Sequence, residues 1–145
     1  MPTLFDKLNL KLQREIVVIN APASFEPELA MLKDVVVLRD AKKAKAVHFA
    51  IAFATQQMEV DALSRALAAK ADGDALIWFA YPKGTSKKYP CEFNRDTGWD
   101  VLRGAGFDTV RAVAIDEDWS ALRFRRVEFI KVAGKWRKSR TFEKL

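Results

Sequence analysis

The stretch Glu15-Ile16-Val17-Val18-Ile19-Asn20 decides how the rest of the chain is interpreted. It is an apolar run, rich in β-branched residues, that ends at Ala21-Pro22. A continuous apolar run of this length is typical of a strand covered on both faces, as in a parallel sheet. Runs of the same character predict three further strands, which lie over Val35–Leu38, Ala46–Ala54 and Ala75–Tyr81.

Helical signals separate these strands. Ser24 is placed to cap a short helix over Phe25–Leu32. The longest helical pattern begins at Thr55 or Gln56 and ends near Ala71, where Asp72-Gly73 follows. Two shorter helices are predicted, one after Thr3 and one from about Asp96 to Arg103. This alternation of strands and helices indicates a mostly parallel sheet with helices on both faces.

The last part of the pattern is different. A strand over Val110–Ile115 is followed by the turn Asp116-Glu117-Asp118, and a last strand begins at Ser120 or Ala121 and continues to Ile130. Because this connection is too short for a crossover helix, the two strands should pair antiparallel. The predicted fold class is α/β: a single Rossmann-like three-layer sandwich of about six strands, with a mostly parallel sheet ending in an antiparallel β-hairpin. Residues 1–130 are expected to form this domain, and residues 131–145 a basic C-terminal extension.

The composition excludes several classes of protein. The 145 residues are 50% hydrophobic, which excludes a disordered or collagen-like chain. The single cysteine, Cys91, has no partner for an internal disulfide, as a secreted scaffold would require. No apolar run reaches the roughly 18 residues of a membrane span, and Met1–Lys11 lacks the pattern of a signal peptide. We therefore expect a cytoplasmic, bacterial-type protein with no membrane contact, in an oligomeric state that the sequence leaves open.

Positive charge is concentrated near the C-terminus. The chain has a formal net charge of +6, and the last 23 residues hold nine Lys or Arg and two Asp or Glu. Such a segment can attract nucleic acid phosphates, anionic lipids or an acidic partner, and the alternative is a solubilising, partly disordered tail. Trp136 and Phe142 lie among these basic residues, which favours a contact surface. The residues predicted to contact nucleic acid or an acidic partner are Arg123, Arg125, Lys135, Arg137, Lys138 and Arg140.

Glycine is missing from the first 72 residues. A Gly-x-Gly-x-x-Gly turn after the first strand lets the backbone approach a pyrophosphate or an adenosyl group. Here that strand ends in Asn20-Ala21-Pro22, and Pro22 and Phe25 would obstruct the approach. The sequence therefore speaks against a standard nicotinamide, flavin or S-adenosylmethionine site, and no cofactor is predicted.

The loop after the fourth strand is the richest candidate for ligand binding. In open parallel sheets, ligands bind beyond the carboxyl ends of the strands. Pro82–Asn94 brings lysines, hydroxyls and a glycine to that edge, a set suited to a small anion, although the spacing of a Walker A loop is absent. The predicted ligand-binding residues are Asn20, Lys83, Ser86, Lys87, Lys88, Arg95 and Asp116.

Other chemically capable residues have simpler structural explanations. Asp116, Glu117 and Asp118 would lie near Arg95 and Asp96 and could divide acid and base roles, but aspartates are also favoured in turns. His48 lies in an apolar strand and is interpreted as a hydrogen-bonded core residue. Cys91 has neither a second cysteine nor an expected contact with His48, so no metal site or Cys–His nucleophile is predicted. The tryptophans expected to pack in the core or on the hairpin are Trp78, Trp99 and Trp119.

Several motifs of the chain form a recognisable set: Lys7–Lys11, Val18–Pro22 with Phe25-Glu26, Trp78–Lys83, Ser86-Lys87 and Ala114–Phe124. Together they resemble a family of small bacterial proteins catalogued as a domain of unknown function. The resemblance implies a fold and a cytoplasmic bacterial setting, but no reaction. The predicted strand order is also similar to the later half of S-adenosylmethionine-dependent methyltransferases, whose sheet likewise ends in an antiparallel hairpin.

The first functional hypothesis is a non-catalytic ligand- or partner-binding module with an anion-accepting loop at the strand ends. Whether the chain is an enzyme is left open, and the missing catalytic constellation favours the answer no. The alternatives are a degenerate methyltransferase-like enzyme, indicated by architecture alone, and nucleic-acid binding through the basic C-terminal segment.

Overall fold

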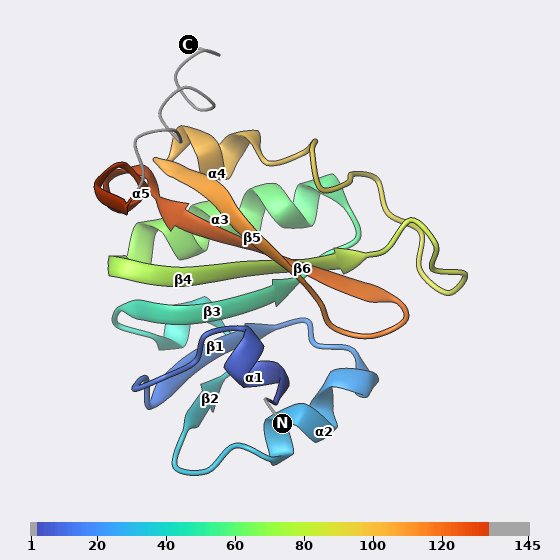
Figure 1. The fold of residues 1–145 in the computed structure, drawn as a ribbon, viewed down its shortest axis with the longest axis horizontal. Coiled ribbons are helices and arrows are strands. Elements are labelled where there is room, and N and C mark those ends of the chain that lie inside the picture. The colour runs from blue at the N-terminus through green and yellow to red at the C-terminus, as the bar shows by residue number, and fades with distance from the viewer. Residues whose placement is uncertain (1–2, 134–145) are drawn as a thin grey trace.

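The computed structural model describes residues 3–133, which form one mixed sheet with helices on both faces (Figure 1). Its strands are β1 (Glu15–Ile19), β2 (Val36–Leu38), β3 (Val47–Phe53), β4 (Ala71–Pro82), β5 (Phe107–Ala114) and β6 (Trp119–Arg126). Its α-helices are α1 (Leu4–Lys7), α2 (Glu26–Ala30), α3 (Gln57–Lys70), α4 (Asp100–Gly104) and α5 (Val127–Ala133). Short 3-10 turns are η1 (Ala23–Phe25) and η2 (Ala41–Lys43).

The sheet has the order β2-β1-β3-β4-β6-β5. The first four of these strands are parallel to one another, whereas β6 pairs antiparallel with both β4 and β5. The predicted α/β fold, with a mostly parallel sheet that ends in an antiparallel hairpin, is confirmed.

Two apolar layers hold the helices against the sheet. On one face, α3 and α4 bury Leu67 and Leu102 against β-strand residues such as Phe79. On the other, Phe5 of α1 and Phe25 of η1 pack in a second cluster. The indole of Trp78 is fully buried there, and its Nε1 donates to the carbonyl of Leu8 at 3.0 Å, which ties α1 to the centre of the sheet. The predicted core positions of Trp78, Trp99 and Trp119 are confirmed.

The last strand is shorter than predicted. Pairing between β5 and β6 begins at the partners Phe107 and Arg126, so no strand is available to continue the ladder beyond Arg126. The backbone N–H of Val127 instead donates to the carbonyl of Gly106 at 2.9 Å, and α5 begins at that residue. Extending the strand to Ile130 was therefore wrong: Ile130 lies in a helix, with its side chain buried.

Among the other boundaries that differ from the prediction, such as the start of β5 at Phe107 rather than Val110, two follow from local backbone geometry. The helix expected from Asp96 begins only at Asp100, because a turn over residues 94–97 and a positive φ of 95° at Gly98 precede it. Strand β4 begins at Ala71 rather than Ala75, directly after α3. Its register against β3 shifts after the pair Val47–Ala71, and Gly73 adopts a φ of 57° in the irregular segment.

Candidate functional site

The carboxyl ends of β1, β3, β4 and β5 lie along one edge of the sheet, as the strand directions require. This carboxyl edge carries Asn20, Thr55, the loop after Pro82, and Asp116. The chain leaves β1 toward β2 on one side and returns to β3 on the other, so the switch point lies between β1 and β3. Open α/β sheets bind their ligands in the crevice at such a point.

At the switch point, the crevice is occupied by side chains of the protein itself. Asn20, in the left-handed conformation with a φ of 59°, donates from Nδ2 to the carbonyl of Phe53 at 3.5 Å. The ring of Phe25 is 1% exposed, and its centroid lies 4.9 Å from that of Phe53. Phe25 therefore packs at the end of β3, the strand next to β1, near the place where a glycine-rich turn would leave room for an adenosyl or pyrophosphate group.

The N-terminus of α3 is occupied in the same way. Glu59 Oε1 accepts from the backbone N–H groups of Thr55 at 3.0 Å and Gln56 at 3.1 Å. Glu92, from the long loop, accepts from the backbone N–H of Gln57 at 2.9 Å. Helix N-termini attract anions because their first N–H groups lack intrahelical partners. Here two carboxylates of the protein take the place that a phosphate oxygen would occupy.

A small hollow of about 230 Å³ lies next to this helix start. Burial raises the pKa of the Cys91 thiol, and a backbone hydrogen bond from Phe93 opposes the shift only in part, so the thiol stays protonated at neutral pH. The residues that line the hollow are Thr55, Gln56, Pro90, Cys91 and Glu92. Sequence reasoning missed Glu92, since nothing in its local pattern connects it to a helix that starts 35 residues earlier.

The lysine-rich loop is fixed against the hairpin turn. The backbone N–H of Lys83 donates to the carbonyl of Asp118 at 2.7 Å, and the Ser86 hydroxyl donates to Asp118 Oδ1 at 2.9 Å. Ser86 Oγ also accepts from the N–H groups of Lys88 and Tyr89. Ser86 thus organises the loop, and within residues 3–133 no ion pair engages the side chains of Lys83, Lys87 or Lys88.

Asp116 is the turn residue that its position predicted. Its Oδ1 accepts from the N–H groups of Asp118 at 2.8 Å and Trp119 at 2.9 Å. Its Oδ2 accepts from the hydroxyl of Ser24 at 3.3 Å, which links the hairpin to η1. These hydrogen bonds bring together two segments that are far apart in sequence and hold the carboxylate in a structural role.

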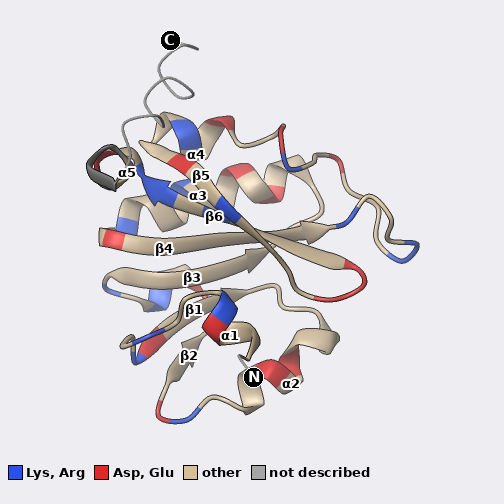
Figure 2. Cartoon of the chain, in the orientation of Figure 1, with Lys and Arg blue, Asp and Glu red and all other residues tan. Residues whose placement is uncertain are grey.

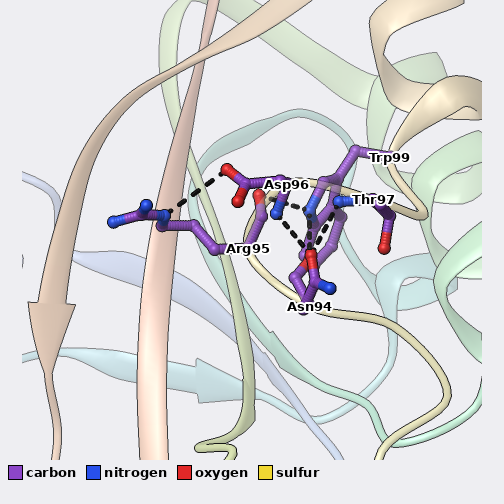
Figure 3. Close-up of polar contacts among 5 residues, drawn as sticks. All are labelled: Asn94, Arg95, Asp96, Thr97 and Trp99. Atoms are coloured by element: carbon purple, nitrogen blue, oxygen red, sulfur yellow. Dashed lines mark hydrogen bonds and ion pairs between the residues drawn. The ribbon is translucent and has the colours of Figure 1, made fainter.

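Arg95 lies in the turn shown in Figure 3. Asn94 Oδ1 accepts from the N–H groups of Asp96 and Thr97, and Trp99 Nε1 donates to the carbonyls of Asn94 and Arg95. The exposed guanidinium of Arg95 is 3.6 Å from the carboxylate of Asp96. Across the described part of the chain, no hydrogen bond or ion pair joins Arg95 or Asp96 to the acidic hairpin turn.

Tyr81, which was not among the predicted site residues, is a buried residue near the end of β4 that lies close to this turn. It is 7% exposed and packs against Phe93 and Trp99, with centroids 6.1 and 5.9 Å away. Burial raises the pKa of its phenol, and the positive charge of Arg95 opposes the shift. Its signal in the sequence is its place as the last aromatic residue of an apolar strand.

The two basic candidates in β6 have different surroundings. Arg125 makes a bidentate pair with Asp74, with Nε and Nη2 at 2.8 and 2.7 Å from the two carboxylate oxygens. Arg123 is half-buried, and no described side chain or carbonyl accepts from its Nε. The other predicted contact residues, Lys135, Arg137, Lys138 and Arg140, lie outside the described residues.

His48 is not the buried core histidine that the sequence predicted. It lies in the irregular part of the β3–β4 ladder, with its side chain 55% exposed, and its Nε2 is 3.0 Å from Asp72 Oδ2. Both residues line an open hollow of about 400 Å³ at the amino edge of the sheet, together with Leu12, Gln13, Gly73, Asp74 and Ala75. The register shift between Val47 and Phe49, where His48 lies, is invisible in a continuous apolar run.

Comparison with solved structures shows the fold of S-adenosylmethionine-dependent methyltransferases. A SAM-dependent methyltransferase from Aquifex aeolicus matches with a TM-score of 0.59 at 14% identity, covering 85% of this chain and 87% of the other. Magnesium protoporphyrin IX methyltransferase from Synechocystis PCC 6803, solved with SAH, matches with a TM-score of 0.54 at 12% identity, covering 85% and 78%. A fibrillarin pre-rRNA processing protein from Methanococcus jannaschii matches with a TM-score of 0.52 at 11% identity, covering 80% and 67%.

At these identities the likeness concerns architecture alone. No protein-family model and no curated protein matches the sequence. The resemblance to a family of small bacterial proteins therefore stays a prediction. Within residues 3–133 no helix is long and apolar enough to cross a membrane.

Proposed function

We propose that this chain is a non-catalytic module on a methyltransferase-like fold, which binds a small anion at the lysine-rich loop of the carboxyl edge. The observation that carries the proposal is the fixed loop itself. Hydrogen bonds to Asp118 and Ser86 hold its backbone, while the ammonium groups of Lys83, Lys87 and Lys88 have no ion-pair partner within residues 3–133. A held loop presents these charges without the entropic cost of ordering it on binding.

The filled crevice supports a binding role rather than methyl transfer. Phe25 packs against Phe53 at the end of β3, and Glu59 and Glu92 accept from backbone N–H groups at the start of α3. One hollow at this edge, of about 230 Å³, is smaller than the roughly 300–1,000 Å³ of most small-molecule pockets. A small anion on the open loop requires no such cavity.

The proposal is tested by thermal shift with pyrophosphate, phosphoenolpyruvate and ADP at millimolar concentration. We expect at least one of them to raise the Tm of the wild-type protein. The triple variant Lys83→Gln, Lys87→Gln, Lys88→Gln should lose the part of that increase that the loop provides. A matched control, Lys42→Gln, Lys43→Gln, Lys45→Gln, makes the same charge change before β3, at the opposite edge of the sheet, and should keep it. Equal shifts in both variants would rule out the loop.

Methyl transfer is the second candidate, and the shared fold favours it. Calorimetry with S-adenosylmethionine separates the two candidates. Under our proposal no binding heat is expected, because the side chain of Phe25 occupies the crevice at the switch point. Stoichiometric binding of S-adenosylmethionine would instead support the enzyme.

A further inference from the structure

Three arginines are neighbours on the face of the sheet that carries α1. Arg123 and Arg125 lie on the same face of β6, since residues two apart on a strand share a face. The cross-strand partner of Arg123 in β5 is Arg111, and its partner in β4 is Trp78. Figure 2 shows Lys and Arg positions along β6.

Only one of these arginines has an acidic partner. Arg125 is held by both carboxylate oxygens of Asp74. Arg123 and Arg111 make no hydrogen bond or ion pair with any residue in the described range. The Nε of Arg123 is buried without an acceptor, whereas Arg111 is exposed.

This arrangement is unfavourable for the isolated protein. Like charges directly opposite each other on neighbouring strands repel, and a buried N–H without an acceptor loses the hydrogen bond that it would make with water. Burial lowers the pKa of Arg123, and the positive charges of Arg125 and Arg111 lower it further, with Asp74 opposing. Because a guanidinium stays charged at neutral pH, a bound anion would relieve this cost.

We propose that Arg111 and Arg123 bind a phosphomonoester dianion on this face of the sheet. A phosphomonoester carries about −1.5 to −2 charges at neutral pH, which matches two unpaired cations. Guanidinium groups hold such oxygens through forked pairs of N–H donors, and the exposed Arg111 offers such a pair beside the half-buried Arg123. Asp74 neutralises Arg125 and so leaves the other two arginines as the binding pair.

The arginine pair is separate from the lysine-rich loop. Trp78, the β4 partner of Arg123, precedes the end of β4 at Pro82 by four residues. At about 3.3 Å per strand residue, the arginine pair lies roughly 13 Å from the carboxyl edge. The inference therefore stands or falls independently of the function proposed for Lys83–Lys88.

Inorganic phosphate is the probe, measured by calorimetry on the full chain at pH 8 and low salt. We expect Arg111→Gln, at an exposed position, to weaken phosphate binding by at least tenfold. Arg123→Lys keeps the charge but loses the forked donors, and we expect a similar loss with an unchanged circular dichroism spectrum. Arg65→Gln removes an exposed arginine from α3 on the opposite face and should leave the affinity unchanged.

Two further arms identify the anion and the site. Dimethyl phosphate, a monoanionic phosphodiester, should bind at least tenfold more weakly than phosphate. Equal binding would overturn the phosphomonoester assignment in favour of a nucleic-acid backbone. If the triple lysine variant loses phosphate binding and Arg111→Gln keeps it, the arginine site is overturned and the loop is supported. Absence of phosphate binding to the wild-type chain would also overturn it.

Discussion

Phe25 is the single residue on which the state of the switch-point crevice depends most. It follows Pro22 in the 3-10 turn η1 and packs against Phe5 and Phe53, with centroids 5.6 and 4.9 Å away. The turn directs an aromatic ring inward against the end of β3, the strand next to β1, so one side chain both stabilises the fold and occupies the place expected for a ligand. A substitution at Phe25 should therefore change both the stability of the fold and the space at the switch point.

Replacing this ring tests its structural contribution. Phe25→Ala should lower the free energy of unfolding by about 3–5 kcal/mol, the usual cost of removing a buried aromatic side chain. Urea denaturation measures the change. Met58→Ala, at a side chain that is 77% exposed, is the control and should change stability by less than about 0.5 kcal/mol. A loss below about 1 kcal/mol for Phe25→Ala would mean that the ring does not fill the crevice in solution.

At the scale of elements, the junction between α3 and the long loop is closely packed around Gly98. Gln57 Nε2 donates to the carbonyl of Gly98 at 2.8 Å, and the backbone of Gly98 has a φ of 95°. A Cβ at this position would lie 2.6 Å from Gln57 Oε1 and 2.7 Å from Phe93 Cβ. Glycine is therefore required here by both the backbone conformation and the neighbouring atoms.

Three glycine variants separate these two causes. Gly98→Ala should destabilise the protein most, by about 2 kcal/mol or more, because it adds a clash to a strained backbone. Gly106 has a φ of 97°, but a Cβ added there would have no neighbouring atom within 4 Å. Gly106→Ala should therefore cost only the backbone strain, roughly 1 kcal/mol. Gly84→Ala, with neither a positive φ nor a near neighbour, should be close to neutral. Thermal denaturation gives the order, and equal losses at positions 98 and 106 would contradict the contact.

At the scale of the whole molecule, the sheet order places β3 and β4 at the centre and β2 and β5 at the edges. The central strands are covered on both faces by the two apolar clusters. Strand β2 has three residues and no fully buried side chain. Stability should therefore fall from the centre of the sheet toward β2.

Native-state amide hydrogen exchange measures this gradient. Amides of β3 and β4 should exchange only through global unfolding, whereas those of β2 should exchange through local opening at a free energy several kcal/mol lower. Burial and strand pairing supply the reason, since opening β2 leaves both apolar clusters almost intact. Protection of β2 equal to that of β3 would show that the edge opens only together with the core.

The candidate site was predictable in part. The edge where Asn20, Asp116 and the lysine-rich loop gather follows from strand direction, which the spacing of apolar runs predicts. The contacts that occupy this edge were not predictable. Glu92 accepts from the start of α3, 35 residues earlier in the chain. The Ser86 hydroxyl donates to Asp118, which lies in the turn between β5 and β6. Such pairs depend on side chains meeting in space, and no local periodicity encodes them.

The sequence by itself determined the α/β class, the parallel strands and the antiparallel hairpin, because burial on two faces and the length of a connection are local properties of the chain. Only the tertiary structure decided where pairing stops. The strand β6 ends at Arg126 because β5 begins at Phe107, and the register between β3 and β4 shifts where His48 lies, with its side chain exposed. It also decided that Arg123 faces Arg111 rather than an acid, since cross-strand neighbours are set by register, which involves two segments at once.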